Sequence, residues 1–118
     1  MIVVFDKIKG IDPRMIANNI TPFEPVHPGE LLKGEIEYRG ISQGKLATQM
    51  GIAYKMLNNI LNERRPISTT TAMLFEAALG IDAGLLIRMQ ADYNLQVATQ
   101  DKTLAIRIAK IRQMASML

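Results

Sequence analysis

A chain of 118 residues is long enough for one domain with a single buried core, and its 48% hydrophobic and 21% charged residues are typical of a globular protein. No apolar run is long enough to cross a bilayer, and the start of the chain lacks the pattern of a secretory signal, so we expect a cytoplasmic protein. The absence of cysteine excludes disulfides, a thiolate nucleophile and a zinc-finger framework, while the net charge of +3 only weakly indicates a polyanionic partner.

The first elements divide into an arm and a helix. Residues 1–26 are expected to form an N-terminal arm, with one helical turn near residues 13–18, because three prolines and an Asn pair disfavour a long element. From His27 the pattern changes to that of a helix, with Pro28 at its first position and Gly40 just past its end. His27 is expected to close the start of this helix rather than to bind a metal.

Two short helices follow, separated by a single glycine turn. Ser42 can cap a helix from Gln43 to Met50, and Gly51 ends it. A further helix is predicted from about Ala53 to Asn62. The expected buried positions of the pair are Leu46, Ala47, Met50, Leu57, Ile60 and Leu61.

The rest of the chain predicts three more helices. Pro66 makes the segment before it a connection, Ser68 or Thr69 caps a helix that ends at Gly80, and Asp82 caps the next one. Capping would explain one residue of the run Thr69, Thr70, Thr71, with the others in solvent. The last helix, within residues 99–118, places apolar side chains at alternating spacings of four and three, at Leu104, Ile108, Ile111, Ala115 and Leu118. Such a seam suits packing against another helix, in a dimer or in a partner protein, and both remain open.

The helix pair at residues 42–62 has the spacing of a helix-turn-helix, in which the second helix enters the DNA major groove. With its apolar stripe buried, that helix turns Tyr54, Lys55, Asn58 and Asn59 outward, and their chemistry suits base edges. Ser42 and Gln43, at a helix N-terminus, suit a phosphate, as do Arg64 and Arg65 beyond the second helix. The alternative is a small helical domain whose polar residues are simply solvated.

The positive charge is concentrated in two segments. Residues 41–65 hold Lys45, Lys55, Arg64 and Arg65 against Glu63, and residues 101–118 hold four basic residues against Asp101, so each segment carries +3. The remainder of the chain is therefore slightly acidic, and the basic tail could equally be a solvated face.

The stretch "SQGKLATQMGI" followed by "LNNILNERRPIS" resembles the core of the Xre family of bacterial helix-turn-helix regulators. Together with "HPGELL" before it and "ALGIDAGLLIRMQADYNLQVA" after it, the match is similar more narrowly to the HigA-type antitoxins of type II toxin–antitoxin modules. The resemblance covers residues 27–98. We therefore expect a helix-turn-helix DNA-binding domain at 27–98 and a C-terminal helix at 99–118 for dimer or partner contact.

The resemblance implies an all-α, compact, lambda-repressor-like fold of five to six helices. It also implies a homodimer that binds double-stranded operator DNA as a transcriptional repressor of its own operon and neutralises a HigB toxin, a RelE-like messenger RNA endonuclease. Ser42 and Gln43 match the family's second-helix start, and Tyr54, Lys55 and Asn59 match its base-facing positions, with Asn58 beside them.

Two departures from the family pattern affect local structure. Ala53 stands where a capping residue is common, and Leu85, Leu86 and Ile87 stand where many members carry aromatic residues.

An enzyme is not expected, because no nucleophile with a base, phosphate loop or metal-ligand spacing can be assembled, and no cofactor is implied. Glu30, Glu35 and Glu37 beside Lys33 indicate solvated ion pairs instead of catalytic carboxylates. Two other functions remain: a solitary Xre-type repressor without a toxin, and a helical protein-interaction module that does not bind DNA.

Overall fold

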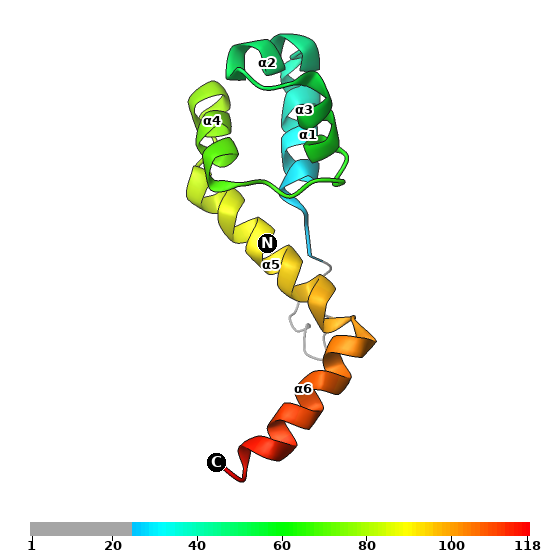
Figure 1. Cartoon of the computed structure of the whole chain (residues 1–118). Coiled ribbons are helices and arrows are strands. Elements are labelled where there is room, and N and C mark those ends of the chain that lie inside the picture. The colour runs from blue at the N-terminus through cyan, green and yellow to red at the C-terminus, as the bar shows by residue number, and fades with distance from the viewer. Residues whose placement is uncertain (1–24) are drawn as a thin grey trace, which may run out of the picture.

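The computed structural model describes residues 25–118, which form six helices and no strand (Figure 1). The expected arm at residues 1–26 and its helical turn lie almost entirely outside the described residues. The helices are α1 Pro28–Arg39, α2 Gln43–Met50, α3 Tyr54–Leu61, α4 Thr69–Leu79, α5 Ala83–Thr99 and α6 Lys102–Ala115. The all-α fold is therefore confirmed for this part of the chain, and none of its helices is long and apolar enough to cross a membrane.

The helix ends follow the sequence signals closely. Side chains of His27, Ser42, Ser68 and Asp82 accept a backbone N–H at the starts of α1, α2, α4 and α5. Asp101 caps α6 in the same way. Gly40, Gly51 and Gly80 end three helices in the left-handed conformation that glycine adopts without strain. As the sequence indicates, α3 lacks a side-chain cap at Ala53.

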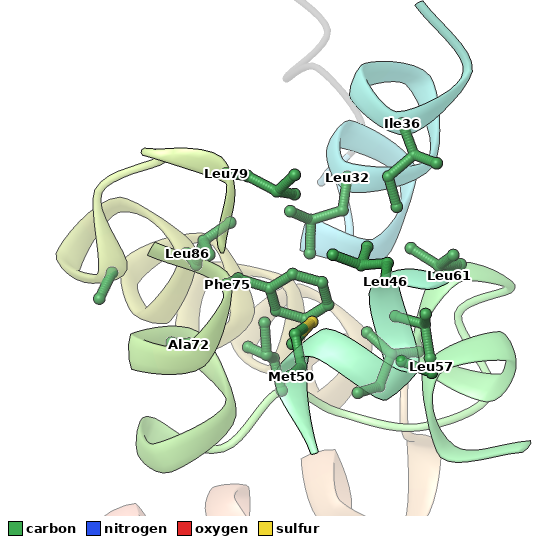
Figure 2. Packing of buried hydrophobic residues seen from close by; sticks show 14 residues of the cluster. Leu32, Ile36, Leu46, Met50, Leu57, Leu61, Ala72, Phe75, Leu79 and Leu86 are labelled. Atoms are coloured by element: carbon green, nitrogen blue, oxygen red, sulfur yellow. The ribbon is translucent and has the colours of Figure 1, made fainter. Parts of the chain in front are cut away.

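One core joins α1 to α5 and is centred on Phe75 of α4. Figure 2 shows its ring pointing into the middle of the cluster, toward Met50 and Leu46 of α2. The predicted stripe of α3, which is Leu57, Ile60 and Leu61, is fully buried against it. The helix α3 therefore depends on packing against its neighbours for its stability and position, because its eight residues are too few for a stable isolated helix.

Two expectations for polar side chains are confirmed only in part. Thr71 is buried, with its hydroxyl oxygen accepting a hydrogen bond from Ser68 at 3.0 Å, because α4 turns this face toward the core. On α1 the ion pair joins Arg39 to Glu35 at 2.7 Å, while Lys33 donates to Asn62 at 3.3 Å, because α3 ends within reach of that side of α1.

The start of α1 lies in close contact with the end of α3. A methyl group at Gly29 would overlap the backbone carbonyl oxygen of Ile60 and would lie 3.0 Å from the His27 ring. The absence of a side chain at Gly29 therefore lets the two helices meet backbone to backbone, which gives the "HPGE" segment a structural role.

The last helix stands apart from the rest. In Figure 1, α6 turns away at the C-terminal end of α5, and among the described helices its main contact is with α5. None of its residues is buried.

Candidate nucleic-acid interface

The helix pair expected from the sequence is present as α2, a short turn and α3. The turn reverses the chain at Gly51, where the amide N–H groups of Gly51 and Ile52 donate to the carbonyls of Thr48 and Ala47. Ile52 packs against the core, and the next residue, Ala53, occupies the N-cap position of α3. The turn is thus anchored on both sides, which sets the direction of α3 relative to α2.

The outer side of α3 carries the predicted polar residues. Tyr54 is 55% exposed and Lys55 is exposed, while Asn58 and Asn59 are half-buried. Ser42, at the start of α2, is exposed, and Gln43 beside it is half-buried. The two helix starts therefore contribute to one polar surface.

A hydrogen-bonded chain of side chains links α2, α3 and the segment after α3. The amide nitrogen of Asn58 donates to Gln43 Oε1 at 3.1 Å, and its oxygen accepts from the Arg64 guanidinium at 3.2 Å. Arg64 Nε also lies 3.3 Å from Asn59 Oδ1. Four of the eight predicted site residues are thus in direct contact, with Asn58 at the centre and both ends of its amide in use.

A left-handed residue brings Arg64 back onto α3. Glu63 has φ of 63°, unusual for a residue with a side chain. The amides of Glu63 and Arg64 donate to the carbonyls of Ile60 and Asn59 at 3.1 and 2.8 Å, the paired bonds of a Schellman ending. This turn reverses the chain so that the Arg64 side chain reaches the amides of α3.

The segment after this turn is held by α5. The amide N–H of Ile67 donates to the buried Gln90 side chain at 2.9 Å, and Gln90 in turn donates to Asn94 at 3.0 Å. Arg65 is exposed between the two anchored positions and is outside the network around Asn58. Gln90 of α5 therefore helps to position residues 64–67, a role that the sequence did not predict.

His27 links the start of α1 to α5. Its Nδ1 accepts the Gly29 N–H at 2.9 Å, and its ring packs edge-on against Tyr93 with 4.9 Å between centroids. Burial lowers the pKa of His27, while Glu63 and a backbone hydrogen bond to Arg65 act in the opposite direction. The neutral ring is thus favoured, which suits a nitrogen that must accept the capping N–H.

Further polar residues adjoin the predicted set. Asn62 accepts from Lys33 of α1 and donates to the Asn58 carbonyl at 2.9 Å, so it joins α1 to the end of α3. The spacing of four between the two Asn residues was a usable signal for this contact. Lys45 lies beside Ser42 in a shallow depression on α2 and adds a positive charge to the same side.

The described residues contain no group of three side chains that could hold a metal ion. What the surface offers is amides, a phenol and cations on one short helix and its borders, which is the chemistry of hydrogen bonding to a nucleic acid.

The comparisons with known proteins point in the same direction. The helix-turn-helix family model matches residues 37–86. Virulence-associated protein I of Dichelobacter nodosus is 36% identical over 78 residues, which is 65% of this chain and 72% of that protein.

Solved structures agree with the sequence matches. An addiction module antidote protein of a HigA family from Coxiella burnetii is 28% identical, with a TM-score of 0.65 over 75% of this chain and 95% of that one. The Pseudomonas aeruginosa antitoxin HigA, solved with the higBA promoter, is 30% identical, with a TM-score of 0.60 over 64% of this chain and 83% of that one.

Proposed function

This chain belongs to the Xre-like helix-turn-helix family of HigA-type antitoxins, and from that premise we propose that it is a sequence-specific DNA-binding antitoxin that represses its own operon. The family consists of DNA-binding regulators, so we assign no catalytic activity to this chain and expect it to act in the cytoplasm. The observation that carries the proposal is the outward polar face of α3, held in place by the core below it and by the Asn58 network beside it.

Within that face we assign base contacts to Tyr54, Lys55 and Asn59. Lysine can donate to guanine acceptors, and an Asn amide can bond adenine at two positions. Asn58 was expected to share this role; both ends of its amide are in hydrogen bonds, with Gln43 and Arg64, whereas for Asn59 the hydrogen bond is at the amide oxygen, from Arg64. We therefore assign Asn58 to positioning, as the residue that keeps Gln43 and Arg64 at fixed places beside the base-contacting side chains.

Phosphate contacts are assigned to the borders of the motif. Ser42 and Gln43 lie at the N-terminus of α2, where backbone N–H groups and the helix dipole favour an anion. Arg64 and Arg65 follow the C-terminal end of α3 and supply positive charge there. Binding should weaken steeply with salt, since each neutralised phosphate releases counterions.

A homodimer would present two copies of α3 to a palindromic operator, roughly 34 Å apart, one turn of the double helix. The proposal also includes a toxin partner of the HigB class, a RelE-like messenger RNA endonuclease. The support for that partner is the similarity to antitoxins, of which the Coxiella relative is an addiction module antidote protein.

The DNA-binding part is tested with Asn59→Ala on promoter DNA from its own operon and on random DNA of equal length. Loss of a base contact should cost about 1–3 kcal/mol on the promoter and much less on random DNA. Gln96→Ala, an exposed amide far along α5, is the matched control and should change neither affinity. Equal losses on both DNAs would remove Asn59 from the residues that select sequence.

The antitoxin part is tested by coexpression with the product of the adjacent small open reading frame. Restored growth together with a copurifying complex would support neutralisation. Promoter binding without any rescue would favour the solitary repressor, and failure to retain DNA at moderate salt would favour the interaction module.

A further inference from the structure

The last helix, α6, carries several exposed apolar side chains. Ile108 and Ile111 are 37% and 60% exposed, and no residue of α6 is buried. The charged residues of this helix are exposed as well, and they are sufficient to keep the helix solvated. The regular repeat of its exposed apolar side chains therefore needs another explanation.

The apolar repeat has the period of a helix that pairs with another helix. Leu104, Ile108, Ile111, Ala115 and Leu118 follow spacings of four and three, which form one narrow stripe. This stripe is called the α6 seam below. It lies beyond α5, and along most of its length it meets none of the other helices within residues 25–118 (Figure 1).

We propose that the α6 seam packs against the α6 seam of a second copy of this chain, with the two helices antiparallel. This specifies the contact surface of the dimer that the proposed function requires. The sizes of the seam residues support it. In the antiparallel register centred between Ile108 and Ile111, those two residues face each other and Leu104 of each copy faces Ala115 of the other, so large meets small. A parallel pair would set Ala115 against Ala115 and leave a gap.

The charges beside the seam select the same orientation. Flanking positions five residues apart face each other in a parallel pair, and these are Arg107 and Arg112, so two like-charge contacts would form. The antiparallel register instead places Arg107 beside Met114 and Arg112 beside Ala105 of the other copy. The aliphatic part of each arginine then covers apolar surface while its charge stays in water.

The helix charges also predict how salt affects the dimer. Lys102, Arg107, Lys110 and Arg112 make α6 basic, so two copies repel at long range and salt should strengthen their association. Salt has the opposite effect on DNA binding. Because 14 residues bury less than a standard protein interface, we expect a dissociation constant in the micromolar range.

The experiment uses the full chain in analytical ultracentrifugation. Ile111→Glu places a charge in the seam and should raise the dimer dissociation constant by roughly 100-fold or more. Ile106→Glu is its matched control, because both residues are 60% exposed and only Ile111 belongs to the seam. Since neither side chain is buried, both variants should keep the helical circular dichroism and melting temperature of the parent.

Orientation is tested by crosslinking, which is clean because the chain has no cysteine. Leu104→Cys mixed with Ala115→Cys under mild oxidation should give a mixed disulfide dimer. Each variant alone should give none, since like positions would lie about 16 Å apart along antiparallel helices, beyond disulfide reach.

A monomer at high micromolar concentration, equal effects of the two Glu substitutions, or disulfides between like positions would each overturn the proposal. A monomer that uses α6 to hold a toxin would overturn it as well. If Ile111→Glu remains a dimer and still binds promoter DNA, this inference is overturned and the proposed function stands. If the parent chain does not bind promoter DNA at all, that result counts against the proposed function alone.

Discussion

Replacing Gly29 with alanine tests how the start of α1 sets the position of α3. The added methyl would overlap the Ile60 carbonyl oxygen and crowd the Ile60 carbonyl carbon and the His27 ring, each at 3.0 Å. Backbone atoms cannot rotate away as a side-chain end can. The two helices would therefore have to separate, which disturbs the His27 cap and shifts the C-terminal end of α3.

The expected loss follows from these contacts. Overpacking of this kind costs about 1–3 kcal/mol, and loss of the His27 cap adds about 1 kcal/mol. Alanine regains about 1 kcal/mol of helix propensity relative to glycine. We expect a net loss of roughly 1–3 kcal/mol in the free energy of unfolding, measured by urea denaturation and circular dichroism. Promoter affinity of the folded fraction should fall too, because Arg64 and Asn58 move with the end of α3.

Gly34→Ala is the control, since it lies on the same helix and a methyl there meets nothing within 4 Å. It should stabilise the chain by about 0.5–1 kcal/mol. The reasoning is refuted if Gly29→Ala unfolds within 0.5 kcal/mol of the parent, a margin set by the usual size of surface effects, or if both substitutions have the same sign.

Three further predictions concern stability. Because burial lowers the pKa of His27, the unfolded state binds the proton more readily, so the free energy of unfolding should be highest above the unfolded pKa of 6.5 and should decline as pH falls below it. The variant His27→Asn keeps a capping oxygen and should flatten this pH dependence in urea titrations. An unchanged pH dependence in the variant would contradict the prediction. Ala53→Ser should raise the free energy of unfolding by about 0.5–2 kcal/mol by supplying the missing cap of α3, and a melting temperature at or below that of the parent would count against it. Gln90→Ala should lower stability by about 1–3 kcal/mol because it leaves the Ile67 N–H buried without its acceptor, whereas Gln96→Ala should be neutral in the same melts.

The sequence was sufficient for features that depend on neighbours three or four residues apart. Helix starts at Ser42 and Asp82, endings at Gly40, Gly51 and Gly80, and the buried stripe of α3 were all predicted correctly. Capping and amphipathic periodicity are local effects, so the residues that cause them lie within the same short stretch. The family resemblance, carried by short motifs, was available on the same basis.

Contacts between distant segments were decided only by the tertiary structure. Asn58 bonds Gln43 15 residues away, Ile67 bonds Gln90 23 residues away, and Lys33 bonds Asn62 29 residues away. No periodicity encodes such pairs, because they depend on the angles at which packed helices cross. For the same reason the sequence did not show that packing of α2 on α3 brings the Asn58 amide to Gln43 and Arg64. It is this packing of distant elements, and not the local pattern, that determines which polar side chains of α3 are held by hydrogen bonds and which are exposed.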